Sequence, residues 1–185
     1  MALKGVFEAY QSKGNHIITC RTEHKAVLDT CAYLEEKGAT ITYLNVDREG
    51  RIDLDELKES FTAKTILVAI MAANNETGVL QDLEKISEIT HQHEAVFFSD
   101  TTQMAGKLPI DVNEMGLDLC SISAHKLYGP KGVGALYIRR KNPRVNLIPL
   151  FHGGGHENGK RSGTLNVTGI VGLGKACEIA QTEFW

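Results

Sequence analysis

The stretch SISAHKLYGPKG, residues 121–132, places groups capable of chemistry at the end of an apolar, strand-like run. Ser123, His125 and Lys126 lie close together there, and a turn rich in glycine and proline follows at once. A lysine at a partly buried strand end can have its pKa lowered, and it then becomes a nucleophile toward carbonyl carbon. The serine and histidine side chains, with backbone N–H groups near them, can hold a phosphate. The stretch therefore predicts a nucleophilic amine beside an anion site.

A second group of polar residues follows other apolar runs. Asp100 comes directly after AVFFS, where its carboxylate can pair with a protonated ring nitrogen and turn a pyridine ring into an electron sink. Gln103 can hydrogen-bond a ring substituent, and His24 can stack on the ring face. Together with Lys126 and the phosphate donors, these residues predict a pyridoxal phosphate site.

Each residue alone has a plainer interpretation. Asp100 is suited to a turn or a helix cap, and His24 to the first turn of a helix. A single lysine such as Lys126 is usually a solvated surface charge. Only the joint placement of these residues favours a site.

Strand and helix patterns alternate along the chain. Short apolar or β-branched runs predict strands at residues 16–20, 40–46, 65–72, 95–100, 118–123 and 134–139. Helical spacing of apolar residues, with caps at Asp53 and Asp82, predicts helices in the segments 1–14, 23–38, 53–61, from 82 onward and 167–184. The pattern predicts an α/β fold, a three-layer sandwich with a mostly parallel sheet.

In open α/β sheets, ligands bind beyond the carboxyl ends of the strands. The polar residues of interest all follow predicted strands: His24 after 16–20, Asn75 after 65–72, Asp100 and Gln103 after 95–99, and Ser123, His125 and Lys126 after 118–122. We therefore expect these side chains to meet at one edge of the sheet.

Composition excludes several other classes of function. The formal net charge of −3 argues against nucleic acid as a partner, and 42% hydrophobic residues is ordinary for a globular chain. The longest apolar run, residues 66–73, is too short to span a membrane. Residues 1–14 resemble an amphipathic helix more than a secretion signal, so a cytoplasmic location is expected. The cysteines show no paired spacing and are expected to be buried structural thiols: Cys20, Cys31, Cys120 and Cys177.

Longer motifs resemble a known family. TEHKAVLDTC, NNETGVLQD, SDTTQMAGKLPID, SISAHKLYGPKGVGALYIRR and HGGGHENGKRSGTLN together resemble the cysteine desulfurases of the iron–sulfur cluster assembly type. These are class V aminotransferase-like members of the fold-type I pyridoxal phosphate enzymes. The resemblance covers essentially the whole chain. It implies conversion of L-cysteine to L-alanine, with the sulfur taken as a persulfide on an enzyme cysteine for delivery to an iron–sulfur scaffold or another sulfur-acceptor protein.

The resemblance also implies a role for each matching residue. It assigns the covalent cofactor linkage to Lys126, and the ring contacts and proton transfer to His24. It assigns the ring nitrogen to Asp100 and the ring hydroxyl to Gln103, and it places Asn75 near the ring hydroxyl and the substrate carboxylate. It assigns the phosphate to Ser123, His125 and, from the other subunit of a homodimer, Thr164.

Some parts of the family pattern do not match. Ala124 and Thr101 stand where many relatives have other small residues. The family's N-terminal phosphate loop and its C-terminal small domain, which carries the persulfide cysteine and an arginine for the substrate carboxylate, have no counterpart here. Residues 1–185 are therefore expected to be an incomplete cofactor-binding large domain, with little or no turnover by itself.

Other interpretations stay open or are disfavoured. The run GIVGLGKA, residues 169–176, has alanine where a nucleotide-binding loop needs serine or threonine, and no strand precedes it. His152 and His156 are separated by three glycines, which disfavours a zinc site on one helical face. A related lyase or transaminase, such as a selenocysteine lyase, and a non-catalytic remnant that acts as an interaction module remain alternatives.

Overall fold

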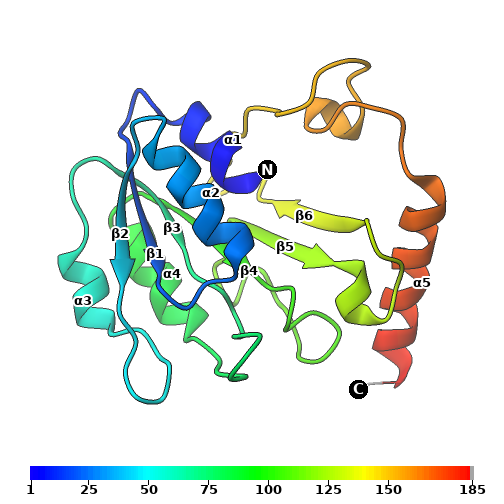
Figure 1. The fold of residues 1–185 in the computed structure, drawn as a ribbon, viewed down its shortest axis with the longest axis horizontal. Coiled ribbons are helices and arrows are strands. Elements are labelled where there is room, and N and C mark those ends of the chain that lie inside the picture. The colour runs from blue at the N-terminus through cyan, green and yellow to red at the C-terminus, as the bar shows by residue number, and fades with distance from the viewer. Residues whose placement is uncertain (184–185) are drawn as a thin grey trace.

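The computed structural model describes residues 1–183 and contains one mixed sheet. In that range the sheet has six strands in the order β2-β1-β3-β4-β5-β6 (Figure 1). The strands are β1 (His16–Cys20), β2 (Thr40–Leu44), β3 (Thr65–Ala69), β4 (Val96–Asp100), β5 (Leu119–Ser123) and β6 (Gly134–Ile138). Neighbouring strands from β2 to β5 are parallel, and β6 pairs antiparallel with β5. The predicted mostly parallel sheet is confirmed.

Helices cover both faces of this sheet. The helices are α1 (Ala2–Ala9), α2 (Lys25–Glu35), α3 (Leu54–Glu59), α4 (Leu83–Gln92) and α5 (Val167–Glu183), with short 3-10 helices η1 (Ala124–Leu127) and η2 (Glu157–Gly159). Helices α1 and α2 lie over one face and α3 and α4 over the other, while α5 stands beside η1 at the β6 end (Figure 1). The predicted three-layer arrangement is confirmed.

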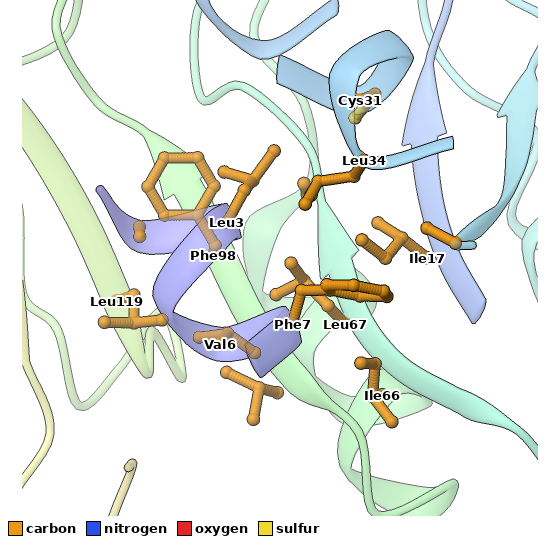
Figure 2. Close-up of a cluster of buried hydrophobic side chains, with 14 of the residues drawn as sticks. Leu3, Val6, Phe7, Ile17, Cys31, Leu34, Ile66, Leu67, Phe98 and Leu119 are labelled. Carbon is orange, nitrogen blue, oxygen red and sulfur yellow. The ribbon is translucent and has the colours of Figure 1, made fainter. Parts of the chain in front are cut away.

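Adjacent residues of the central strands pack into opposite layers. In β3, Leu67 lies in the cluster under α1 and α2, whereas Val68 lies in the cluster under α3 and α4. Phe98 and Phe97 of β4 divide in the same way. Successive side chains of a strand point to opposite faces, so a strand covered on both sides is apolar throughout. Figure 2 shows the first of these clusters, where Phe7 of α1 lies close to Leu67.

The predicted helix starts at two aspartates are confirmed. The Asp53 side chain accepts hydrogen bonds from the backbone N–H groups of Asp55 and Glu56, and the Asp82 side chain accepts one from Lys85. A capping side chain satisfies N–H groups that have no partner within the helix, and each such cap stabilises a helix by about 1 kcal/mol. These local contacts explain why sequence patterns located both helices well.

The inward face predicted for the last helix is wrong in part. Of the residues expected to face inward, Ala180 is buried, Leu173 is half-buried, and Ile170 and Cys177 are exposed. Phe184 lies outside the described residues. Helix α5 packs on η1 through small side chains, Ala176 and Ala180 against Leu127, so it buries only a narrow stripe. Cys177 is thus not the buried thiol expected, whereas Cys20, Cys31 and Cys120 are buried as expected.

Two further sequence features have clear positions. The GIVGLGKA run lies within α5, as its packed-helix interpretation requires. Among the described residues, no helix combines the length and the apolar character needed to cross a membrane.

Candidate cofactor site at the carboxyl ends of the parallel strands

The parallel strands end at one edge of the sheet, and the predicted site residues follow those ends. Asp100 is the last residue of β4 and Ser123 the last residue of β5. His24 begins α2 just after β1, and Asn75 lies in the loop after β3. Because β1, β3, β4 and β5 are mutually parallel, the fold brings these segments to the same edge, as predicted.

Asp100 is a half-buried carboxylate with a fixed orientation. Its Oδ1 accepts hydrogen bonds from the backbone N–H of Thr102 at 3.0 Å and from the Ser121 hydroxyl at 3.1 Å. Within residues 1–183, its Oδ2 has no hydrogen-bond partner. The turn-forming interpretation of Asp100 is therefore right, and it leaves one carboxylate oxygen available to a cationic ligand atom.

The SISAHKLYGPKG stretch forms the end of β5 followed directly by η1. Ala124 and Leu127 of η1 are buried, and His125 and Lys126 between them are exposed. The Ser123 hydroxyl and His125 Nδ1 form a hydrogen bond of 2.8 Å. The strand end at Ser123 is half-buried as expected, and Lys126 is exposed because a 3-10 turn that buries its first and last residues directs the middle ones to solvent.

His24, Asn75 and Gln103 line the same edge. His24 is exposed and caps α2, because its Nδ1 accepts a hydrogen bond from the Ala26 N–H at 3.1 Å. Asn75 is exposed and donates to a Glu76 carboxylate oxygen at 3.2 Å. Gln103 is half-buried, and its side-chain oxygen accepts a hydrogen bond from Lys107 at 3.1 Å. The ring of His24 is thus oriented by the helix that it begins.

Thr164 is not part of this strand-end group. It is exposed, in the segment between η2 and α5, and no hydrogen bond or ion pair within residues 1–183 joins it to the other predicted site residues. The resemblance assigned it to the site of a partner subunit. That role stays a prediction.

Sequence reasoning missed two residues beneath the site, Glu23 and Asn74. Glu23 is only 5% exposed, and its Oε1 accepts a hydrogen bond from the N–H of Met71, which follows β3. Asn74 donates to the Thr22 backbone oxygen at 2.9 Å. In the sequence both look like ordinary polar loop residues, and their position beside His24 and Asn75 is the only signal that could have drawn attention to them.

The chemistry of these side chains fits pyridoxal phosphate. Asp100 offers a protonated ring nitrogen an oriented carboxylate oxygen that has no partner among residues 1–183, and Lys126 offers a solvent-accessible amine to an aldehyde. Ser123 and His125 offer a hydroxyl and a ring nitrogen to a phosphate; His125 directly precedes Lys126 and Ser123 lies three residues before it. The residues present are therefore compatible with the cofactor predicted from the sequence.

The comparisons with known proteins identify the family of the chain. The aminotransferase class-V family matches residues 1–184. The chain belongs to the class V aminotransferase family. This membership agrees with the observed fold.

Two similar curated proteins carry the same name. A curated relative from Histophilus somni (strain 2336), cysteine desulfurase IscS, is 57% identical over 183 residues, which are 99% of this chain and 45% of that protein. Cysteine desulfurase IscS of Ehrlichia chaffeensis is 56% identical over 181 residues, 98% of this chain and 44% of that protein. The chain thus spans less than half the length of these relatives.

Solved structures of similar proteins have the same fold. A NifS-like protein superposes with a TM-score of 0.93 at 45% identity, covering 99% of this chain and 50% of that one. A structure described as SspA in complex with cysteine gives a TM-score of 0.90 at 43% identity, covering 96% of this chain and 51% of that one. The cysteine desulfurase CsdA of Escherichia coli gives a TM-score of 0.83 at 30% identity, covering 92% of this chain and 47% of that one.

Proposed function

We propose that this chain is the cofactor-binding part of a pyridoxal-phosphate-dependent cysteine desulfurase that serves iron–sulfur cluster assembly. The observation that carries the proposal is the meeting of Asp100, Ser123 and Lys126 at one sheet edge, in a chain 57% identical over 183 residues to a cysteine desulfurase. The substrate would be L-cysteine, and the protein with bound cysteine among the structural relatives supports that choice.

The proposed chemistry uses the residues of this chain in distinct ways. Pyridoxal phosphate, when bound, supplies an electron sink that stabilises negative charge developing on the substrate. The Lys126 amine would hold the cofactor aldehyde, and Asp100, oriented by Ser121 and Thr102, would supply the negative charge opposite the ring nitrogen. Ser123 and His125 would hold the phosphate.

The remaining strand-end residues would orient the ring and move protons. The His24 imidazole would lie against the ring face and exchange a proton with the substrate, since an imidazole nitrogen can accept or donate a proton. Gln103 and Asn75 would hydrogen-bond the ring hydroxyl. Thr164 would reach the phosphate of a partner subunit, so the proposal includes a homodimer.

The sulfur transfer balances when a second thiol accepts the sulfur. L-cysteine and an acceptor thiol give L-alanine and a persulfide: the carbon–sulfur bond of cysteine breaks, and a sulfur–sulfur bond forms. The acceptor is expected outside residues 1–185. The burial of Cys20, Cys31 and Cys120 supports that expectation, and a persulfide formed on the exposed Cys177 would contradict it. The persulfide would then pass to a scaffold or another sulfur-acceptor protein. The cytoplasmic location stays a prediction.

The test is an absorbance titration of the purified chain with pyridoxal phosphate, followed by borohydride reduction and peptide mapping. A visible absorption band and a label on Lys126 would support the proposal. A band with the label on another lysine would contradict the assigned site. Absence of both would favour the non-catalytic interaction module, and a preference for selenocysteine over cysteine in a chain joined to the missing parts would favour the lyase.

A further inference from the structure

A buried carboxyl group links the loop between β1 and α2 to the segment that follows β3 through a hydrogen bond. Glu23 lies directly before His24, and its Oε1 accepts a hydrogen bond from the Met71 N–H. The other oxygen, Oε2, is buried and has no hydrogen-bond partner within the described part of the chain. A buried ionised carboxylate with one oxygen unpaired is very costly, so this geometry favours a neutral, protonated group.

A second tie joins the same two loops. The Asn74 amide donates to the Thr22 backbone oxygen at 2.9 Å. The Asn74 side-chain oxygen accepts from the backbone N–H groups of Glu76 and Thr77, each at 2.9 Å, and from the Thr77 hydroxyl at 3.2 Å. This side chain therefore shapes the turn that presents Asn75 and also fastens it to the loop that presents His24.

We propose that Glu23 and Asn74 form a clamp that fixes His24 and Asn75 relative to each other, and that Glu23 does so while holding its proton. Both are positioning residues, since each acts through a neighbour in the chain. The inference rests on the proposed function for the statement that His24 and Asn75 face the cofactor. The clamp itself rests only on the contacts given above.

The charges around Glu23 agree with a neutral group. Burial raises the pKa of its carboxyl to about 8; the Met71 N–H hydrogen bond opposes this rise, and the negative charge of Asp100 adds to it. Cys20 of β1 and Cys31 of α2 also lie within its electrostatic reach, and burial raises the pKa of both thiols. A protonated Glu23 leaves Asp100 without a second anion beside it, which suits an aspartate that must hold a cation.

Hydrogen exchange tests the clamp in the chain without cofactor. The Ala26 N–H donates to His24 Nδ1, so its protection reports how firmly that ring is held. Glu23→Ala and Asn74→Ala are expected to speed exchange of the Ala26 N–H about tenfold, since the first leaves a buried polar group unpaired and the second a part-buried one. Glu23→Gln, which keeps the acceptor oxygen, is expected to preserve the protection and the NMR shifts of the His24 ring.

The control is Leu57→Ala, which removes a fully buried side chain of α3 in the other helical layer. It destabilises the whole fold without removing either tie. Equal Ala26 exchange in Leu57→Ala and Glu23→Ala, after correction for global stability, would overturn the clamp. A Glu23→Gln variant as mobile as Glu23→Ala would overturn it too.

The proton on Glu23 is tested by unfolding at different pH values, again without cofactor. The carboxyl has a higher pKa in the folded chain than in the unfolded chain, so the folded state binds more protons between the two values. The free energy of unfolding of the wild type should therefore fall relative to that of Glu23→Gln as pH rises from about 4.5 to about 8. Above pH 8 the difference between the two proteins should stay constant. If the difference in the free energy of unfolding between wild type and Glu23→Gln does not change with pH, Glu23 is ionised in the folded chain and the proposal is overturned.

A cofactor titration separates this inference from the proposed function. If the chain binds pyridoxal phosphate, Glu23→Ala should weaken binding while borohydride still places the label on Lys126, and Glu23→Gln should bind as the wild type does. Unchanged affinity in Glu23→Ala would overturn the coupling of the clamp to the site. If wild type and variants all fail to bind, the proposed function fails, and the exchange and unfolding measurements still decide the clamp.

Discussion

The Ser121 hydroxyl donates a hydrogen bond to Asp100 Oδ1 at 3.1 Å, across the parallel pair β4 and β5. Together with the Thr102 N–H, it fixes the carboxylate and leaves Oδ2 available. A ligand that places a cation there meets a preorganised partner, so little orientational freedom is lost on binding.

Asp100→Asn should weaken pyridoxal phosphate binding by tenfold or more, about 1.4 kcal/mol, because a charge-assisted contact to the ring nitrogen is lost. Ser121→Ala should weaken it less, by about fivefold, since it removes one of the two hydrogen bonds that orient the carboxylate. Fluorescence titration with the cofactor measures both. The matched control is Asp111→Asn, an exposed aspartate that accepts similar turn hydrogen bonds from Asn113 and Glu114. An equal loss of cofactor affinity in Asp111→Asn would contradict the role of Asp100.

Lys126→Ala should abolish the borohydride-stable label and leave the free energy of unfolding within about 0.5 kcal/mol of the wild type, because the side chain is exposed. Lys131→Ala, at a nearby exposed lysine, should keep the label. Mass spectrometry of the reduced peptides reads out both variants. A label that persists after the Lys126 substitution would refute its assignment.

Gly106→Ala should disturb the segment that carries Lys126. Gly106 has a φ of +71°, and an added Cβ would lie 2.0 Å from the Leu127 Cδ2. Gly78→Ala is the matched control, because its φ of +75° carries a similar strain of about 1–3 kcal/mol and nothing lies within 4 Å of its added Cβ. Chemical denaturation should show a larger loss in the free energy of unfolding for Gly106→Ala than for Gly78→Ala. Equal losses would mean that Leu127 moves aside freely.

His16 should make stability fall at acid pH. Its ring contacts the hydroxyls of Thr65 at 2.7 Å and Thr42 at 2.9 Å, and burial lowers the pKa of the ring. The unfolded chain therefore binds a proton more readily, and this contribution is lost as pH falls through 6.5 and below. Urea unfolding of the wild type and of His16→Gln at several pH values measures the effect. Parallel profiles for the two proteins would contradict it.

Cys177 should be the thiol that reacts with Ellman's reagent in the native chain, because it is exposed whereas Cys20, Cys31 and Cys120 are buried. Cys177→Ser should remove the fast reaction, and denaturant should restore reactivity at the other positions. Fast native labelling of Cys31, which is fully buried on the inner face of α2, would disagree with the packing of that layer.

The local sequence determined the elements and the edge at which the site lies. The caps at Asp53 and Asp82 and the strand runs ending near Asp100 and Ser123 depend on residues close in the chain, and the structure confirms them. Parallel strands then bring their carboxyl ends to one edge, so the position of the candidate residues followed from the order of the elements.

The tertiary structure decided which of these side chains are buried. Glu23 is buried because it meets the N–H of Met71, 48 residues away in the sequence. Lys126 is exposed because η1 buries Ala124 and Leu127 instead. Cys177 is exposed because α5 contacts the rest of the chain through a narrow stripe. A residue's type and local spacing limit its conformation, but its burial depends on which distant segments pack against it.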